Sequence, residues 1–354
     1  MEQLKKVLLY SSAVFLALSL LWWQLLFNSS TVQQHFPVVV HLFTQLCVFG
    51  GLAVVAWTGG YFIYDLLHSE RVVPSAEKVV LITGCDSGFG HRLARRLDAL
   101  GFTVVAGVLA KEGEGAKELA ERCSSRLRVL PMDVTKVEDV KRVVGELQQM
   151  SNKQQQLWAV VNNAGIALGL PFDWGRDVEC YQRTFDVNVF GLVRVTKFAM
   201  PLLRANRGSR VVNVASVAGR ITAPLIGHYC MAKHSVRVFS DVLRRELLTD
   251  GVQVVTIEPT FYQTPIVNFE QINRTRERLL EETEPETRAA YSPSKVRSMM
   301  NMEKLVNVVT RTNVDEVVDA LERAVTLKSP KVRGKGKGTR ERVSLSFFQL
   351  YPSF

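Results

Sequence analysis

Cysteine is scarce in this chain, and its placement argues against two common ways of stabilising a fold. Five cysteines are spread over 354 residues, and no two of them have the short spacing of a metal-binding motif. They are Cys47, Cys85, Cys123, Cys180 and Cys230. The odd number also argues against a complete disulfide framework. The sequence therefore predicts no metal site, and it favours a reducing compartment.

Positive charge is unevenly distributed, which bears on the choice of partner. The net charge is +10, but residues 328–342 hold seven basic residues against one acidic residue, Glu341. Most of the excess charge therefore lies in a C-terminal tail. A basic tail of this kind is more typical of contact with anionic lipid, or of a solvated segment, than of nucleic-acid recognition.

Two stretches near the N-terminus lack charged residues. Residues 7–27 contain no Lys, Arg, Asp or Glu, and a second apolar run covers residues 37–64. Each run is long enough to span a bilayer. The short segment between them has no Lys or Arg, whereas Lys5, Lys6 and Arg71 flank the outer ends. The positive-inside rule then predicts two membrane-spanning helices with both ends in the cytosol; the alternative is a cleaved signal peptide followed by a core helix.

From residue 78 onward, short buried-strand patterns alternate with amphipathic helical patterns. Strands are predicted at residues 78–83, 103–109, 127–132, 157–161, 210–215 and 252–257. Helices are predicted directly after the first strand and at residues 111–123, 137–150, 187–203 and 229–249. This alternation is that of βαβ units. It predicts an α/β fold with a doubly wound parallel sheet in a single Rossmann-type domain.

The expected domain boundaries follow from where this alternation starts and stops. We expect a membrane anchor over residues 1–66, a linker over 67–77, the α/β domain over 78–330 and a divergent basic tail over 331–354. Residues 260–310 interrupt the alternation with three prolines and clustered charges. This stretch is interpreted as an insertion that covers the substrate site.

Tyr229 and Lys233 stand four residues apart in the sequence Tyr-Cys-Met-Ala-Lys. On a helix this spacing places both side chains on one face, one turn apart. An ammonium group at that distance would favour the phenolate and lower the pKa of the tyrosine. Such a phenol could exchange a proton with an alcohol or a carbonyl. Alone, however, the spacing is common on solvated helix faces.

A glycine-rich loop follows the first predicted strand and opens a helix. It reads Gly-Cys-Asp-Ser-Gly-Phe-Gly over residues 84–90. Glycines let the backbone approach a pyrophosphate, and the N–H groups and dipole of the helix stabilise its charge. The spacing differs from the G-x-G-x-x-G of two-domain dehydrogenases, and alone it is equally compatible with a tight turn.

Five ordered motifs together resemble those of the short-chain dehydrogenase/reductase family, over roughly residues 78–330. The family's T-G-x-x-x-G-x-G corresponds to residues 83–90, its N-N-A-G to residues 162–165 and its Y-x-x-x-K to residues 229–233. The family's helix asparagine falls at Asn188, and its serine falls at Ser216. Residues 83–90 are similar to the branch of retinol, hydroxysteroid and 3-hydroxybutyrate dehydrogenases. Residues 101–109 and 125–133 resemble most the 17β- and 11β-hydroxysteroid dehydrogenases of type 2.

The resemblance implies a role for each residue of the site. Tyr229 would exchange the proton, and Lys233 would lower its pKa and hold the nicotinamide ribose. Ser216 would hydrogen-bond the substrate oxygen, and Asn188 would position a relay water. His228, next to the tyrosine, is interpreted as a pocket-wall or surface residue. The implied cofactor-binding residues are Gly84, Asp86, Ser87, Gly88, Phe89, Gly90, Asp133, Asn162, Ala164, Tyr229, Lys233, Pro259 and Thr264.

Two departures from the family pattern concern the substrate end. The usual P-G after the sixth strand is replaced by Pro259-Thr260, and the basic tail from Lys331 replaces an aromatic segment. The cofactor is expected to be NAD, with NADP less favoured. The second strand ends without Arg or Lys to pair with a 2′-phosphate, and Asp86 would repel one. The nearby Lys111 is expected to lie on an exposed turn, where it would contribute little.

These features predict an oxidoreductase that transfers a hydride between NAD(H) and a lipophilic alcohol or ketone, such as a hydroxysteroid or a retinoid. We expect it in the endoplasmic reticulum membrane with the catalytic domain in the cytosol. Its expected partners are the substrate and the membrane, without nucleic acid, and a homodimer is left open. One alternative is a small hydroxy-acid dehydrogenase of the 3-hydroxybutyrate type. The other is a catalytically idle membrane scaffold with the same fold.

Overall fold

The structure of the protein is a computed structural model. It describes residues 37–68, 72–151, 155–267, 269–300 and 310–334, together with positions 17, 19, 21 and 24. The chain divides into two compact units. The smaller unit comprises Met1–Val72 with Leu327–Val332, and the larger unit comprises Val73–Thr326 with Arg333–Phe354.

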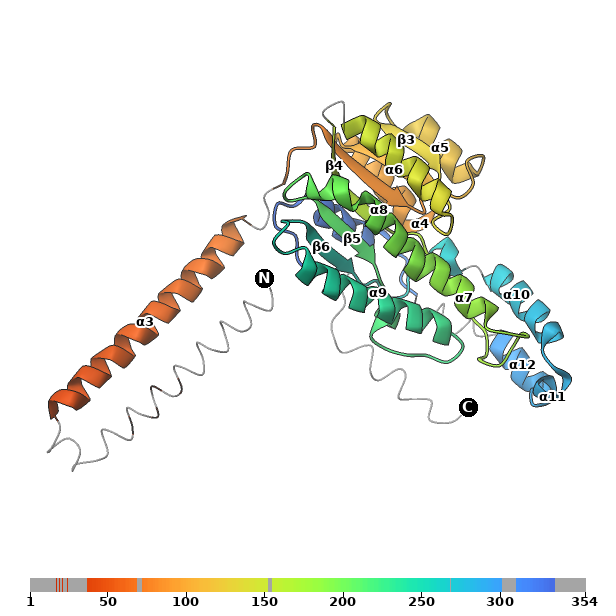
Figure 1. Ribbon diagram of the computed structural model, residues 1–354. Helices are drawn as coiled ribbons and strands as arrows, with labels where there is room; N and C mark the ends of the chain where they lie inside the picture. The colour runs from red at the N-terminus through yellow and green to blue at the C-terminus, as the bar shows by residue number, and fades with distance from the viewer. Residues whose placement is uncertain are drawn as a thin grey trace. The chain divides into compact units, whose positions relative to one another are not determined.

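A parallel sheet forms the centre of the larger unit (Figure 1). Its strands are β1 (Lys78–Thr83), β2 (Thr103–Val108), β3 (Leu127–Pro131), β4 (Gln156–Asn162), β5 (Arg210–Val214), β6 (Gln253–Ile257) and β7 (Arg333–Gly334). Their order in the sheet is β3-β2-β1-β4-β5-β6-β7, and every pairing is parallel. The order reverses between β1 and β4, which creates the crevice where ligands bind in doubly wound folds. The predicted fold class and the six predicted strands are confirmed.

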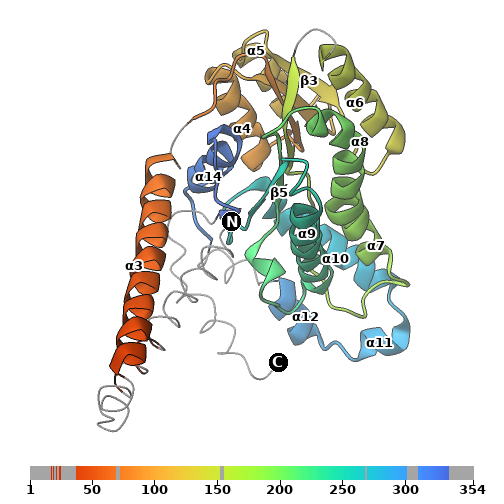
Figure 2. The same cartoon turned by 60° about the vertical axis from the view of Figure 1, so that its left-hand side comes forward.

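Helices cover both faces of this sheet (Figure 2). They are α4 (Gly88–Ala99), α5 (Glu114–Arg122), α6 (Val137–Ser151), α8 (Leu192–Arg204), α9 (Gly227–Glu246) and α14 (Asp315–Thr326). Successive side chains of a strand point to opposite faces, so the unbroken apolar run of β1 packs into two cores. Val80 and Ile82 lie in the core under α4, α5 and α14, whereas Val79 and Leu81 lie in the core under α6, α8 and α9.

The helix predicted at residues 187–203 is longer and less regular than expected. α7 (Glu179–Phe185), the π-helix η1 (Asp186–Gly191) and α8 follow one another without a break. A π-helical turn inserts one extra residue into a helix and is frequent at functional sites. Here the π-helical turn contains Asn188, one of the predicted catalytic residues.

The stretch interpreted as an insertion forms short helices near α7 (Figures 1 and 2). They are η3 (Pro265–Val267), α10 (Phe269–Glu282), α11 (Pro285–Ala289) and α12 (Pro293–Met300). A small separate core of Leu170, Trp174, Cys180 and Leu279 joins α10 to the segment that precedes α7. We call α10, α11 and α12 the lid.

The smaller unit contains one long described helix, α3 (Pro37–His68), which coincides with the second predicted membrane segment. Within it, Thr44–Ile63 has a mean hydropathy of 1.8, and it is the one described segment long and apolar enough to cross a bilayer. Its large side chains are exposed, for example Leu46 at 72% and Phe49 at 66%, unlike those of a core helix. The first predicted segment lies outside the described residues apart from four positions, so it stays a prediction.

Candidate active site

The glycine loop lies at the carboxyl end of β1 and turns directly into α4. Gly84 and Gly88 have positive φ values of 69° and 64°, which only glycine adopts freely. A Cβ on Gly84 would lie 2.8 Å from the Cα of Ala164. The Asn163 amide nitrogen also donates to the carbonyls of Thr83 and Gly84, each at 2.9 Å. The two sequence motifs are therefore packed against each other at the point where the strand order reverses.

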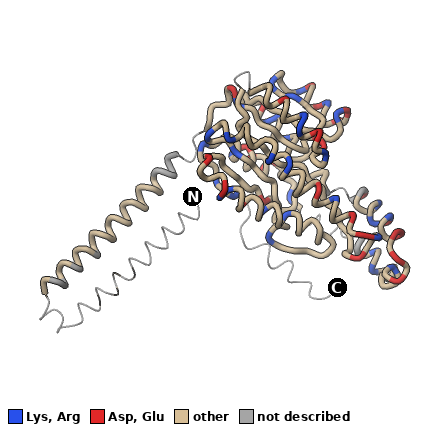
Figure 3. The backbone as a smooth tube through the Cα atoms, in the orientation of Figure 1, with Lys and Arg blue, Asp and Glu red and all other residues tan. Residues whose placement is uncertain are grey.

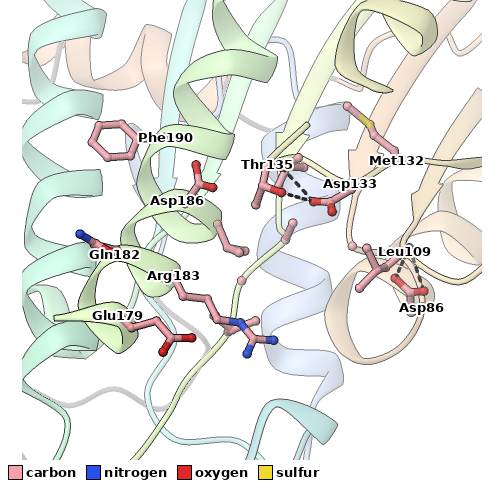
Figure 4. A pocket seen from close by; sticks show the side chains of 16 residues that line it. Asp86, Leu109, Met132, Asp133, Thr135, Glu179, Gln182, Arg183, Asp186 and Phe190 are labelled. Atoms are coloured by element: carbon pink, nitrogen blue, oxygen red, sulfur yellow. Dashed lines mark hydrogen bonds between the residues drawn. The ribbon is translucent and has the colours of Figure 1, made fainter. Parts of the chain in front are cut away.

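A cavity of about 770 Å³ opens beside this loop (Figure 4). Of the predicted cofactor residues, it is lined by Gly84, Asp86, Asp133 and Ala164. The other lining residues are Leu109, Met132, Val134, Thr135, Gly165, Ile166, Glu179, Gln182, Arg183, Asp186, Val187 and Phe190. The cavity thus follows the carboxyl ends of β1 to β4. A cavity of this volume, beside the loop that leads into the N-terminus of α4, fits a dinucleotide.

Sequence reasoning missed the wall of the cavity formed by α7 and η1. Its residues at positions 179, 182, 183, 186, 187 and 190 repeat at intervals of three and four, which is one face of a helix. Those labelled in Figure 4, at positions 179, 182, 183, 186 and 190, lie across the cavity from Asp86 and Asp133. Because the helix was predicted only from residue 187, this face was not recognised. Extending the pattern back to residue 179 would have found the shared face.

The Asp86 carboxylate binds the turn that follows β2. Its oxygens accept hydrogen bonds from the Leu109 backbone N–H at 2.9 and 3.0 Å, and Oδ1 accepts one from the Ala110 N–H at 3.0 Å. In this fold the adenosine ribose is held at the end of the second strand. A negative charge therefore already occupies the backbone donors at the place where a 2′-phosphate would need them.

Two other predicted cofactor residues have their side chains engaged with the protein. Asp133 Oδ1 accepts from the Thr135 backbone N–H at 2.9 Å and from the Thr135 hydroxyl at 2.7 Å. Asn162 is 3% exposed, and its Nδ2 donates to Thr196 Oγ1 at 2.9 Å and to Asn213 Oδ1 at 2.8 Å. Asn162 therefore fixes β4 to its neighbours through its side-chain nitrogen, whereas its buried Oδ1 has no hydrogen-bond partner within the described part of the chain.

The segment after β6 returns to the glycine loop. Phe89 packs edge-to-face on Tyr262, with ring centroids 5.9 Å apart. A Cβ on Gly88 would lie 3.8 Å from the Thr264 side chain, and the Pro259 carbonyl accepts the Val217 N–H at 2.8 Å. The remaining loop residues of the prediction, Ser87 and Gly90, form the N-cap and the first turn of α4. The predicted residues Pro259 and Thr264 therefore lie at the edges of the same site.

Ser216, Tyr229 and Lys233 converge where β5 ends and α9 begins. Ser216 caps the short helix η2 (Val217–Gly219), since its Oγ accepts the Ala218 N–H at 3.2 Å, and its hydroxyl also hydrogen-bonds Tyr229. Lys233 is 4% exposed, and its Nζ donates to the Val214 carbonyl at 2.9 Å. The same Nζ lies 5.6 Å from the centre of the Tyr229 ring.

Asn188 completes the predicted group from the other side of the cleft. Its Oδ1 accepts the Ile166 N–H at 2.8 Å, and its Nδ2 donates to the Ile166 carbonyl at 2.9 Å. A Cβ on Gly165 would lie 3.2 Å from Asn188 Oδ1 and 3.7 Å from Lys233 Nζ. Both polar atoms therefore flank one point, next to the N-N-A-G segment.

The electrostatics of this group differ from the expectation. Burial raises the pKa of Tyr229 to about 12, and the hydrogen bond with Ser216 offsets only part of that effect. Burial also lowers the pKa of Lys233 to about 8. The expected lowering of the tyrosine pKa by Lys233 is therefore wrong for this structure, because desolvation of the phenolate dominates and the opposing effect comes from Ser216.

The fold and the glycine loop together define a class of protein. A doubly wound parallel sheet, with a glycine loop at its switch point, is the architecture of proteins that bind dinucleotides. Residues 78–275 match the short chain dehydrogenase family, which covers more than half of the chain. The protein belongs to the short-chain dehydrogenase/reductase family of oxidoreductases. Within it, the protein lies in the branch of hydroxysteroid and retinol dehydrogenases.

Individual relatives agree with this placement. Estradiol 17-beta-dehydrogenase 2 of Rattus norvegicus is 39% identical over 272 residues, which are 76% of this chain and 71% of the relative. Retinol dehydrogenase 7 of Rattus norvegicus is 38% identical over 285 residues, which are 80% of this chain and 88% of the relative. A solved short chain dehydrogenase/reductase from Burkholderia phymatum, in complex with NAD, aligns with a TM-score of 0.61 and 23% identity over 75% of this chain and 90% of its own, a likeness of fold alone.

Proposed function

We propose that the protein is a membrane-anchored oxidoreductase that transfers a hydride between NAD(H) and a lipophilic alcohol or its carbonyl product. The observation that carries the proposal is the convergence of Asn188, Ser216, Tyr229 and Lys233 beside a cleft that fits a dinucleotide. The relatives support a hydroxysteroid or a retinoid as the substrate, because their names denote estradiol and retinol.

The four side chains divide the work of proton transfer. Tyr229 exchanges a proton with the substrate oxygen, and Ser216, which hydrogen-bonds Tyr229, holds that oxygen beside the phenol. Lys233 places a buried cation beside the tyrosine ring and has donors left for the nicotinamide ribose. Asn188 fixes the backbone of Ile166, which lines the cleft. Bound NAD supplies the hydride acceptor, and that chemistry belongs to the cofactor.

The same geometry supports NAD rather than NADP. Asp86 holds a carboxylate against the backbone N–H groups of Leu109 and Ala110. A 2′-phosphate at this turn would meet a like charge and would find those donors already occupied, whereas a ribose hydroxyl can donate a hydrogen bond to the carboxylate. Comparing kcat/KM for NAD and NADP tests this part of the proposal. Equal values, or a preference for NADP, would refute it.

A membrane anchor is the second part of the proposal. Residues 1–66 would form the anchor and residues 67–77 a linker, with the catalytic domain over 78–330 and the basic tail over 331–354. The apolar and exposed surface of α3 supports it, since Figure 3 shows no Lys, Arg, Asp or Glu along the described part of that helix up to Ile63. We place the protein in the endoplasmic reticulum membrane with the domain in the cytosol.

Two measurements test the anchor and its orientation. Removal of residues 1–66 is expected to release much of the protein into the soluble fraction. Protease added to sealed microsomes is expected to digest the catalytic domain. Complete protection of the domain would overturn the orientation, and unchanged membrane association of the truncated protein would overturn the anchor.

The substrate class is tested with the detergent-solubilised full-length protein. NADH formation is measured with estradiol, retinol and 3-hydroxybutyrate, for the wild type and for Tyr229→Phe as the inactive control. We expect turnover of the steroid or the retinoid and none in the variant. Turnover of 3-hydroxybutyrate alone would establish the small hydroxy-acid alternative, and no turnover with any substrate, despite NAD binding, would favour an idle scaffold.

A further inference from the structure

The loop between β4 and α7 contacts several elements that carry the predicted catalytic residues. We call residues 166–175 the bridge loop. At its start, the Asn188 side chain hydrogen-bonds both the N–H and the carbonyl of Ile166. Further on, the Leu170 N–H donates to the Leu225 carbonyl at 2.7 Å, in the segment that separates Ser216 from Tyr229. The position of the bridge loop is therefore tied to the geometry of the site.

His228 joins the bridge loop to the catalytic helix α9. It directly precedes Tyr229, is 1% exposed, and interacts with the Leu168 backbone carbonyl. Its Nε2 has no hydrogen-bond partner within the described part of the chain, and on that basis we assign the donor to Leu168 to Nδ1. Its ring packs edge-to-face on Tyr181 of α7, with centroids 5.5 Å apart. Burial lowers the pKa of His228 to about 4, so the imidazole is neutral at working pH.

Arg276 joins the next residue of the bridge loop to the lid. It lies on α10, is 4% exposed, and its Nε donates to the Gly169 carbonyl. A Cβ on Gly169 would lie 2.7 Å from Arg276 Nη2, so the guanidinium packs directly on this backbone. Two more hydrogen bonds connect the bridge loop to the segments between the lid helices. The Gly175 N–H donates to Thr283 Oγ1 at 2.8 Å, and the Tyr291 hydroxyl donates to Asp173.

We propose that the bridge loop couples the lid to the catalytic helix, with His228 and Arg276 as the positioning residues at its two ends. The anchored carbonyls belong to consecutive residues, Leu168 and Gly169, whose peptide units share the Gly169 Cα, and the two anchors restrict the dihedral rotation through which one carbonyl could shift without the other. A movement of α10 over the substrate therefore displaces the Leu168 carbonyl and, through His228, the first turn of α9 that holds Tyr229. Displacements of this kind alter rates strongly, because proton transfer requires close alignment.

Three substitutions separate this coupling from simple packing. His228→Phe keeps the aromatic contact with Tyr181 but removes the donor to Leu168, whereas His228→Asn keeps a donor close to the position of Nδ1. Arg276→Met keeps much of the apolar stem and removes the Nε donor to the Gly169 carbonyl.

Each helix also offers a matched control. On α9 the control is His234→Phe, because His234 Nδ1 faces the Cys230 carbonyl of its own helix at 2.8 Å. On α10 the control is Arg278→Met, because the Arg278 side chain pairs with Glu282 at 3.1 Å. Within the described part of the chain, neither control residue hydrogen-bonds the bridge loop, so both test the effect of the substitution type alone.

The kinetic readout rests on the proposed function and uses the full-length protein with its best substrate. We expect His228→Phe to lower kcat about 10- to 100-fold with the KM for NAD unchanged, and His228→Asn to stay within about threefold of the wild type. The two controls should change kcat less than about twofold. In the double variant His228→Phe/Arg276→Met, the fold-loss of kcat should be at least about five times smaller than the product of the fold-losses in the two single variants, because both substitutions act through one loop. Equal losses in His228→Phe and His228→Asn, or independent effects in the double variant, would overturn the proposal.

Hydrogen exchange provides a second readout that requires no turnover. In His228→Phe, the amides of Leu170 and Gly175 and those of α10 should exchange faster than in the wild type and in His234→Phe. If His228→Phe does not fold, Arg276→Met tests the coupling from the other end, where the first turn of α9 should exchange faster. Unchanged exchange across the loop would refute the coupling even if the enzyme is active, and altered exchange would support it even if no substrate is turned over.

Discussion

The proposed cofactor end of the site, at the glycine loop, and the proposed substrate end, between the bridge loop and the lid, are built in different ways. The cofactor end consists of short contiguous motifs and backbone groups, such as the glycine loop packed on the Ala164 backbone. The substrate end consists of side chains that meet across long stretches of chain. Arg276 and Gly169 are 107 residues apart, and Tyr291 and Asp173 are 118 residues apart. A site of the first kind is encoded locally, whereas a site of the second kind exists only after the fold has assembled it.

Because of this difference, the two ends tolerate different amino-acid substitutions. At the cofactor end, Gly84 has a positive φ and no room for a Cβ, so any other residue there is strained. At the substrate end, Leu279 and Trp174 share one apolar core, and contacts of this kind can be repacked by residues of similar volume. If the proposed function holds, the cofactor end preserves one binding mode, while the lid is free to determine the substrate. Substitutions at each end, and at the catalytic group between them (Ser216, Tyr229 and Lys233, called the junction), test this comparison.

The largest effect is expected at the junction, from Tyr229→Phe. Phenylalanine keeps the ring but cannot exchange a proton, so kcat should fall about 10²- to 10⁴-fold, the usual contribution of a general acid–base group. NADH binding, followed by fluorescence titration, should change less than about twofold because the residues that line the cleft are untouched. A variant that keeps a tenth of the wild-type activity would show that another group transfers the proton.

The cofactor end could be predicted from the sequence because its signals are local. The strand before Gly84, the loop spacing and the N-N-A-G segment lie within short windows, and the structure brings Gly84, Asp86, Asp133 and Ala164 to one cavity. The direction of the Asn162 side chain could not be predicted, because which side of a strand end faces the core depends on partners that are distant in the sequence.

The substrate end escaped prediction because its determinants are tertiary. No local sequence pattern pairs Arg276 with Gly169. The sequence also does not distinguish His228 from an ordinary polar residue, because its contacts with Tyr181 and Leu168 form only in the folded protein.

The raised pKa of Tyr229 escaped prediction for the same reason. The order of the motifs predicted that Ser216, Tyr229 and Lys233 meet, and the spacing of the last two reveals their proximity. The burial that dominates both of their pKa values, however, is a property of the assembled core.

A second test at the junction concerns stability. The pKa of Lys233 is lowered by burial from 10.5 to about 8, so the unfolded chain binds more protons between these values and stability rises with pH across that window. Below pH 8 the wild type carries the full cost of a buried ammonium group, about 3 kcal/mol. Lys233→Met should therefore be inactive yet more stable at neutral pH, by up to about 3 kcal/mol.

Denaturant unfolding of the solubilised protein at several pH values measures this effect. The free energy of unfolding of the wild type should increase from about pH 8 to about pH 10, and that of Lys233→Met should lack this component. The control is Lys141→Met on α6, because Lys141 Nζ lies 5.7 Å from the centre of the Phe198 ring, away from the catalytic group. This control should keep the pH dependence of the wild type. A destabilised Lys233→Met would mean that the bond from Nζ to the Val214 carbonyl outweighs the cost of burial.

A smaller effect, confined to the cofactor end, is expected from Asp86. In Asp86→Ala the backbone N–H groups of Leu109 and Ala110 lose their acceptor and become available to a 2′-phosphate. The ratio of kcat/KM for NADP to that for NAD should rise about 10- to 100-fold, because a repulsive charge is removed and donors are gained. Asp86→Asn should give an intermediate ratio, since it removes the charge but keeps an acceptor at the turn. An unchanged ratio in both variants would show that cofactor choice is made elsewhere.

The smallest effect is expected at the substrate end, from Tyr291→Phe. The substitution removes the hydrogen bond to Asp173 but keeps the edge-to-face contact with Trp174, whose ring centroid lies 5.4 Å away. One partly exposed hydrogen bond contributes about 1 kcal/mol, so the lid should loosen slightly and the KM for the alcohol should rise about two- to fivefold. The KM for NAD should stay constant, because the residues that line the cofactor cleft do not include this pair. Steady-state kinetics with each substrate varied in turn measures both constants, and a parallel rise in the KM for NAD would mean that the two ends are not built independently.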